Sequence, residues 1–367
     1  MINKYKKIVI KIGSSSIIDP NTKKIRSQWI TNFCKDISKL HKNKKIIIVC
    51  SGAIALGSNS ISKRKNLRRL EDKQAAAAIG QIELAYQWKQ KLKKHKINVA
   101  QLLLTLDDSE VRRRYLNARK TINALHENNI IPIINENDTV ATEEIRYGDN
   151  DRLAARVAQM SDADLLILLS DVDGLYDKNP FKNNNAKKIN EVSKIDKKIE
   201  EIGNYQTSDF GSGGMATKIW AAKICMNNGC TTIITNSAKK NPLTDTSTKN
   251  STIFYSNKTP SSSRKQWLLN HLHPSGKITV DEGASSAIKD NKSLLPAGII
   301  EVNGKFSRGD VVTILSSKKI KIAIGISAYD MKEAKKIIGK NTKEISKILG
   351  YEGRDEIIHK DDLVIII

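Results

Sequence analysis

The stretch Pro132-Ile133-Ile134-Asn135-Glu136-Asn137-Asp138-Thr139-Val140 decides the fold of this chain, together with Gly148-Asp149-Asn150-Asp151 a few residues later. The apolar run 130–134 predicts a buried strand, and amides and carboxylates follow it directly. Such a loop suits a polar substrate that carries an amino group, or a metal. A plain solvated turn is the alternative, because Asn and Asp favour turns for local hydrogen-bonding reasons.

Three further apolar runs end in short loops rich in glycine, hydroxyls and carboxylates: 7–12 before Gly13, 45–50 before Ser51, and 164–169 before Ser170-Asp171. Helical patterns separate these runs, over 27–41, 74–84, 107–128 and 152–160. This alternation predicts an α/β domain with a largely parallel sheet sandwiched by helices. Ligands of such sheets bind outside the carboxyl ends of the strands, where all these loops fall.

A glycine-rich stretch, Gly211-Ser212-Gly213-Gly214-Met215-Ala216-Thr217-Lys218, precedes a helix that we predict over 219–227. It resembles a phosphate cradle, since glycines expose backbone N–H groups, a helix start is positive, and Lys218 adds charge. The spacing of a Walker A loop is absent, and no G-x-G-x-x-G follows the first strand. For this stretch alone, a flexible glycine turn is the alternative.

The chain changes character after about residue 256, where a polar stretch contains Pro260 and three successive serines. Short β-rich segments follow, at 277–280, 299–302, 311–315, 320–326 and 363–367. Two helical segments interrupt them, at 331–339 and 342–349. We therefore expect a first domain over 1–256, a linker over 257–275 and a smaller, mostly β domain over 276–367.

Composition narrows the function classes. The chain has 367 residues, which is enough for two domains, and a net charge of +23. Such an excess can signal nucleic acid or an anionic substrate, but the basic residues do not gather into one arm. The four cysteines lack zinc-finger spacing and predict reduced, buried thiols. No apolar run approaches the roughly 18 residues of a membrane span, and the amino terminus does not read as a signal peptide, so we expect a soluble, cytoplasmic protein.

Six stretches, in this order, resemble the amino acid kinase family: Lys11-Ile12-Gly13-Ser14, Cys50-Ser51-Gly52-Ala53, Asn135-Glu136-Asn137-Asp138, Gly148-Asp149-Asn150-Asp151, Ser170-Asp171-Val172-Asp173-Gly174-Leu175-Tyr176 and Gly213-Gly214-Met215-Ala216-Thr217-Lys218. The tail resembles a PUA domain, through Asp281-Glu282-Gly283-Ala284, Ser293-Leu294-Leu295-Pro296-Ala297-Gly298 and Phe306-Ser307-Arg308-Gly309-Asp310. Two small departures are Cys50, where a hydroxyl residue is usual, and Ser170, where Thr is usual.

Within this family the chain is most similar to the members that phosphorylate the γ-carboxylate of L-glutamate, using ATP and Mg²⁺. Their product is L-glutamyl 5-phosphate, the first intermediate of proline biosynthesis from glutamate. A carboxylate acceptor is already ionised at neutral pH and needs no general base. The protein must instead position two anions and offset their repulsion.

The resemblance implies that Lys11 and Lys218 flank the transferring group and that Asp151 holds both lysines in place. It assigns L-glutamate to Ser51, Asp138 and Asn150. It assigns ATP to Lys11, Gly13, Ser170, Asp171, Ser212, Gly213, Gly214, Met215, Ala216, Thr217 and Lys218. It gives no protein ligands for Mg²⁺, which the phosphates of ATP would hold.

The resemblance also implies a homo-oligomer (dimer or tetramer), feedback inhibition by L-proline, and a glutamyl phosphate reductase as partner. Two alternatives stay open. The first is another kinase of this fold, acting on aspartate, N-acetylglutamate, carbamate or a nucleoside monophosphate; the Asn135–Asp138 stretch and the tail count against it. The second is an RNA-binding or RNA-modifying protein acting through the PUA-like domain; the kinase motifs of the first domain count against it.

Overall fold

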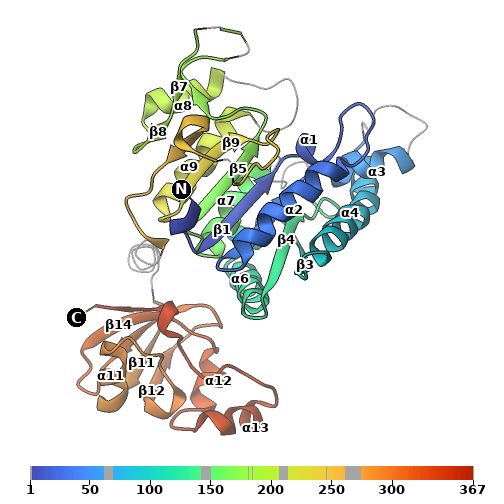
Figure 1. Ribbon diagram of the computed structural model, residues 1–367. Coiled ribbons are helices and arrows are strands. Elements are labelled where there is room, and N and C mark those ends of the chain that lie inside the picture. The colour runs from blue at the N-terminus through green and yellow to red at the C-terminus, as the bar shows by residue number, and fades with distance from the viewer. Residues whose placement is uncertain are drawn as a thin grey trace. The chain divides into compact units, whose positions relative to one another are not determined.

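The computed structural model describes residues 2–61, 69–141, 150–180, 182–183, 185–205, 214–244, 246–260 and 274–366. The chain divides into two compact units, Met1–Ser261 and Ser262–Ile367 (Figure 1). The linker expected over 257–275 falls largely outside the described residues. Within the described ranges, no helix is long and apolar enough to cross a membrane.

An eight-stranded sheet forms the centre of the first unit, in the order β3-β4-β2-β1-β5-β9-β10-β8. Its strands are β1 (Lys7–Ile12), β2 (Lys45–Cys50), β3 (Asn98–Leu104), β4 (Ile130–Glu136), β5 (Leu165–Ser170), β8 (Glu191–Val192), β9 (Thr231–Asn236) and β10 (Ser251–Phe254). Neighbours from β3 across to β9 are parallel, and β10 runs antiparallel to β9. The prediction of a largely parallel α/β sheet is confirmed.

Helices cover both faces of this sheet (Figure 1). One face packs against α6 (Arg112–Glu127), α7 (Asn150–Met160), α8 (Lys197–Tyr205) and α9 (Met215–Asn227). The other packs against α1 (Ser14–Ile17), α2 (Ser27–His41), α3 (Ala53–Ile61) and α4 (Leu70–Lys93). Strand residues alternate between the faces, so Val9 packs with the first group while Ile8 and Ile10 pack with the second. Lys7 and Lys11, two residues either side of Val9, share its face.

Three helices differ from the sequence prediction. α4 is longer than 74–84, because strong helix formers flank that segment on both sides. The segment 107–128 forms two helices, α5 (Leu106–Glu110) and α6, because a capping box between Thr105 and Asp108 starts the first, and Val111 is extended. α9 begins at Met215 rather than 219, so Lys218 lies in its first turn.

The backbones of α3 and α4 touch where they cross. A Cβ atom at Gly57 would lie 1.9 Å from the carbonyl oxygen of Ala76, and one at Gly80 would lie 1.8 Å from that of Ala53. No side chain fits at either position, so the close approach requires glycine on both helices. The contact holds the start of α3, just after Ser51, against the middle of α4.

The second unit has its own sheet, in the order β12-β11-β13-β14-β15, with mostly antiparallel pairs. Its strands are β11 (Gly276–Val280), β12 (Ile299–Gly304), β13 (Val311–Leu315), β14 (Lys321–Ile326) and β15 (Leu363–Ile365). Its helices are α11 (Glu282–Lys289), α12 (Met331–Lys336) and α13 (Ile345–Leu349). The sequence did not predict α11, which Asp281 caps by accepting a hydrogen bond from the Ala284 N–H at 2.7 Å. The expected separate, mostly β unit is confirmed.

Candidate active site

Most of the residues predicted to bind substrates or act in catalysis lie at the carboxyl edge of the parallel strands. Gly13, Ser51 and Asp138 follow the ends of β1, β2 and β4, and Ser170 is the last residue of β5. Lys218 and Asp151 come from the first turns of α9 and α7. A parallel sheet brings these distant segments to one edge because every strand ends there.

Three charged side chains meet at this edge and are almost completely buried. The Lys11 Nζ lies 2.6 Å from Asp151 Oδ1, and the Lys218 Nζ lies 2.9 Å from Asp151 Oδ2. The Asp151 side chain is 0% exposed and each lysine side chain 7%. The Thr217 hydroxyl lies 3.2 Å from the same Asp151 Oδ2. Three elements, β1, α7 and α9, therefore converge on one carboxylate.

The electrostatics of this cluster keep the carboxylate ionised. Burial by itself would raise the pKa of Asp151, but the charges of Lys11 and Lys218 and their hydrogen bonds hold that pKa well below its usual range. The position of Asp151 in the first turn of α7 acts in the same direction, because a helix amino terminus favours anions. Two ammonium groups therefore contact the same buried carboxylate at this edge. Two cationic side chains close together suit an anionic ligand.

Side-chain amides form a second buried cluster beside the first. The Asn150 Nδ2 lies 2.8 Å from the Cys50 carbonyl oxygen, 2.7 Å from the Ser51 Oγ and 2.8 Å from the Asn135 Oδ1. The Asn135 Nδ2 in turn donates to Gln81 Oε1 at 2.7 Å. The sequence prediction gave no role to Gln81; its only signal was a polar residue on the Ala-rich face of a helix expected to be buried.

The predicted nucleotide side of the edge centres on the end of β5. The Ser170 hydroxyl donates to Asp171 Oδ1 at 2.9 Å, and the Asn236 side chain donates to the Asp171 carbonyl oxygen at 3.3 Å. Ser170 is buried and Asp171 is exposed. Asn236, at the end of β9, thus holds the loop from the neighbouring strand, a contact that the sequence did not predict.

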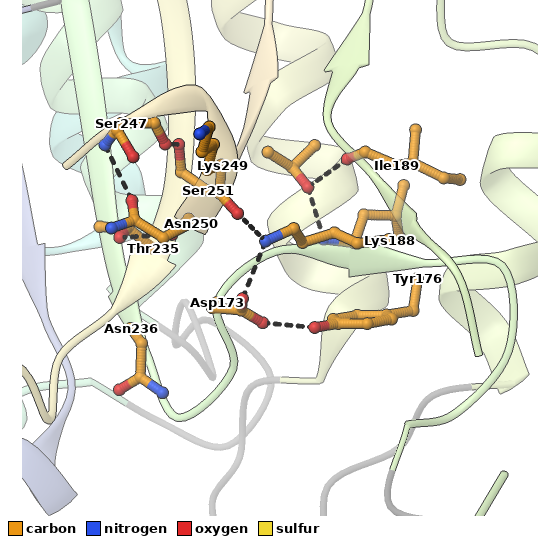
Figure 2. Close-up of polar contacts among 12 residues, drawn as sticks. Asp173, Tyr176, Lys188, Ile189, Thr235, Asn236, Ser247, Lys249, Asn250 and Ser251 are labelled. Carbon is orange, nitrogen blue, oxygen red and sulfur yellow. Dashed lines mark hydrogen bonds and ion pairs between the residues drawn. The ribbon is translucent and has the colours of Figure 1, made fainter. Parts of the chain in front are cut away.

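A small hairpin, β6 (Leu175–Tyr176) and β7 (Lys188–Ile189), continues this loop. Figure 2 shows Asp173 between Tyr176 and Lys188; the Tyr176 hydroxyl donates to it at 2.7 Å and the Lys188 Nζ at 2.9 Å. Lys188 also donates to the backbone carbonyl of Lys249 (Figure 2). These contacts attach the hairpin to the segment before β10 and support the loop after Ser170.

Several other predicted residues also lie at this edge. Asp138 is partly buried, in the turn two residues beyond β4. Gly13 precedes α1 with an ordinary φ of −72°, and a Cβ there would extend into open space. Gly214, Met215 and Ala216 form the start of α9. Ser212 and Gly213, with Gly148 and Asp149, lie outside the described residues.

Metal ligation by protein side chains alone finds no support at this edge. Across the part of the chain that the structure describes, no group of three or more His, Cys, Asp or Glu side chains could hold a metal ion. The buried carboxylate of Asp151 already contacts two ammonium groups.

Comparison with known proteins gives matches for both units. The amino acid kinase family matches residues 6–236, and the PUA domain matches residues 276–349. The glutamate 5-kinase of Paramagnetospirillum magneticum is 47% identical over 361 residues, covering 98% of this chain and 97% of that protein. The glutamate 5-kinase of Pelagibacter ubique is 49% identical over 359 residues, covering 97% of each.

Among solved structures, carbamate kinase from Giardia lamblia bound to AMP-PNP is similar to the first unit. It covers 69% of this chain and 99% of its own, with a TM-score of 0.50 and 18% sequence identity. At that identity the similarity shows the fold alone.

Proposed function

The chain belongs to the amino acid kinase family and, within it, to the glutamate 5-kinases, and from this premise we infer how its residues divide the reaction. The enzyme transfers the γ-phosphoryl group of ATP to the side-chain carboxylate of L-glutamate, which gives ADP and L-glutamyl 5-phosphate. This reaction is the first step of proline biosynthesis from glutamate. The buried contact of Lys11 and Lys218 with Asp151 is the observation that carries the assignment of roles.

The main obstacle in this reaction is repulsion between a carboxylate nucleophile and a triphosphate. Lys11 and Lys218 would approach the transferring phosphoryl group from different elements, β1 and α9, and neutralise charge as it moves between the two oxygens. Asp151 keeps both ammonium groups oriented. No general base is required, since the acceptor is already ionised.

L-Glutamate is assigned to Ser51, Asp138 and Asn150. The carboxylate of Asp138 suits the α-ammonium group, with which it would form a charge-assisted hydrogen bond. Ser51 precedes α3 (Ala53–Ile61), so its hydroxyl and the free N–H groups of that helix start suit a carboxylate. The side-chain carboxylate of the same glutamate molecule would then extend toward the lysines.

ATP is assigned to the opposite side of the same edge. The first turn of α9 offers backbone N–H groups at Met215, Ala216 and Thr217, and its positive end favours phosphate. Gly13 leaves open space beside the end of β1. Ser170 and Asp171 would face the nucleotide from β5, and Ser212 with Gly213 and Gly214 would complete the phosphate loop.

Mg²⁺ would enter with ATP, because the phosphate oxygens are ligands of the kind that this ion prefers. The bound ion would withdraw charge from the β- and γ-phosphates. The lysine cluster and the ion would thus share the neutralisation of the triphosphate.

Self-association is proposed through α4. Its outer face carries a stripe of exposed apolar side chains, with Ile79 44%, Ile82 75% and Tyr86 53% exposed. Their spacing of three and four residues places them on one side of the helix, as in helix-mediated interfaces. We expect Ile82→Asp to lower the mass measured by light scattering, whereas an unchanged mass would exclude this surface.

From the family resemblance we further propose L-proline as feedback inhibitor, a glutamyl phosphate reductase as partner, and the cytoplasm as location.

The test of the reaction is ADP release with and without L-glutamate, coupled to hydroxylamine trapping of the acyl phosphate. We expect both signals with L-glutamate and neither with aspartate, N-acetylglutamate or carbamate. Adding L-proline should lower the rate. Stronger trapping with any other acceptor would contradict the substrate assignment.

A further inference from the structure

We propose that Gln81 is a positioning residue of the glutamate site: through Asn135 it fixes the orientation of the Asn150 side chain, and thereby which atoms face the substrate. The proposal rests on the proposed function, because it takes Asn150 and Ser51 as glutamate ligands. Gln81, Asn135 and Asn150 are 9%, 3% and 7% exposed, so water cannot substitute freely for their hydrogen-bond partners.

The orientation of Asn135 follows from its backbone neighbour. The Glu136 N–H donates to the Asn135 side chain at 2.9 Å, and a backbone N–H can only donate. The atom that it reaches must therefore be the carbonyl oxygen Oδ1. The amide nitrogen Nδ2 then faces α4, where it donates to Gln81 Oε1 at 2.7 Å. Gln81 is thus the acceptor that holds this orientation.

The orientation of Asn150 follows by the same reasoning. Its Nδ2 lies 2.8 Å from the Cys50 carbonyl oxygen and 2.8 Å from the Asn135 Oδ1, two atoms that can only accept. The nitrogen must be on this side, so the carbonyl oxygen of Asn150 is the atom that can accept a hydrogen bond from an ammonium group.

The same nitrogen fixes whether the Ser51 hydroxyl can donate to the substrate. The Asn150 Nδ2 lies 2.7 Å from the Ser51 Oγ, so its two hydrogens serve three oxygens and one of them is shared. Because an amide nitrogen does not accept, the Ser51 hydrogen is kept to donate elsewhere. Asn150 would thus present an acceptor and Ser51 a donor. An amino acid needs this pair, because it carries an ammonium group beside a carboxylate.

Removing the acceptor oxygen of Gln81 would disturb this arrangement of donors and acceptors. The Asn135 Nδ2 would be buried without its partner, which costs about 1–3 kcal/mol. Rotating the Asn135 amide would relieve that cost, but its nitrogen would then oppose the Asn150 nitrogen. Asn150 would have to turn as well, and would present a donor where the ammonium group binds. If Gln81 only held α4 against the sheet, its substitution would lower stability and would change the KM values for both substrates to a similar extent.

The experiment compares Gln81→Met, which removes the acceptor, with Gln81→Glu, which keeps one. We expect Gln81→Met to raise the KM for L-glutamate about tenfold and to change the KM for ATP by less than about twofold. Gln81→Glu should keep the glutamate KM within about threefold of the wild-type value. Gln87→Met is the matched control, since the Gln87 amide donates to Glu83 on the same helix and, among the residues that the structure describes, to no residue of the glutamate site.

An unchanged glutamate KM in Gln81→Met, or an equal rise in both KM values, would overturn the proposal. If Gln81→Met does not fold, a second pair decides. Asn135→Asp alone should be mild, because the Gln81 amide can rotate and donate to the new oxygen. Combined with Gln81→Glu it should be severe, because two carboxyl groups would then face each other; additive effects would overturn the proposal. A wild-type enzyme without glutamate-dependent ADP release would instead refute the proposed function.

Discussion

The two ends of β1 each carry a lysine on the same face of the sheet, and one helix, α7, reaches both. At the carboxyl end, Lys11 contacts Asp151 in the first turn of α7 at 2.6 Å. At the amino end, the Lys7 Nζ donates to the carbonyl oxygen of Ser161, just past the last turn of α7, at 2.5 Å. Both contacts agree with the helix dipole, which favours an anion at the first turn and a cation at the last.

The surroundings of the two lysines differ in charge. At the amino end, Lys7 and Arg119 lie near two carboxylates, those of Asp162 and Asp164, and Lys45 adds a charge that solvent screens. Burial lowers the pKa of Lys7. At the carboxyl end, the ammonium groups of Lys11 and Lys218 both contact the carboxylate of Asp151. One helix and one strand therefore carry a structural contact at one end and, at the other, the charged cluster for which we propose a role in phosphoryl transfer.

The largest expected effect tests the difference between the two ends of β1 directly. Lys218→Met removes one of the two ammonium groups and should lower kcat by about 10²–10³-fold or more, because the interaction of Lys218 with the transferring phosphoryl group strengthens as charge moves in the transition state. Glutamate binding, measured by calorimetry, should survive. Lys7→Met is the matched control and should leave kcat within about twofold. A kcat for Lys218→Met as high as that of the control would remove the catalytic role of Lys218.

The next effect separates the two substrates at the carboxyl end. Asp138→Ala should raise the KM for L-glutamate about 10–100-fold, because a hydrogen bond to a charged group contributes about 1.5–3 kcal/mol. Asp171→Ala should act mainly on the KM for ATP. Steady-state kinetics with each substrate varied in turn measures both. An unchanged glutamate KM in Asp138→Ala would refute its assignment.

The smallest effect is a pH dependence of the free energy of unfolding, which arises from His126 near the amino end of β1. His126, in the last turn of α6, is buried beside the carbonyl oxygen of Ile46 at 3.2 Å, and that oxygen can only accept, so Nε2 is the donor. Burial, with smaller contributions from Lys7, Lys45 and His41, lowers the His126 pKa to about 4.

The unfolded chain binds the His126 proton first as the pH falls, because an unperturbed histidine has a pKa of about 6.5. The stability contribution is complete above that value and falls by up to about 3 kcal/mol as the pH approaches the folded-state pKa. Asp151 has a depressed pKa, so its contribution persists in this window and is lost only at lower pH. As the pH falls, the free energy of unfolding should therefore lose the contribution of His126 before that of Asp151.

Urea unfolding at pH values from about 7 to 4.5 measures this slope. His126→Gln is the control, since its amide can still donate toward Ile46 but does not titrate. We expect the variant to lose less stability than the wild type over the range. Equal slopes would show that another group causes the pH dependence.

The strands and the order of the loops could be predicted from the sequence because each rests on local pattern. The apolar runs of β4 and β5 are buried on both faces, so their composition alone marks them. The roles of Lys11, Asp151 and Lys218 came from a resemblance, since nothing local in the sequence shows that a strand and two helices meet at one carboxylate.

The remaining features depend on contacts between distant segments. Gln81 and Asn135 are 54 residues apart, and only the packing of α4 on the sheet brings their amides together. The start of α9 was missed because Gly213-Gly214 favours a loop, while the helix begins directly after Gly214. The break at Val111 depends on a cap at Thr105, which competes with continuous helix propensity on both sides.

The glycine crossing of α3 and α4 also limits how this enzyme can evolve. Ser51 lies just before α3, and Gln81 follows Gly80 directly in α4. A methyl group at Gly57 or Gly80 would force the helices apart, and so would displace Ser51, the proposed glutamate ligand, relative to Gln81. Mutations that retune acceptor preference are therefore expected in the loops after the strands, since a side chain at either of these two positions would collide with the backbone of the other helix.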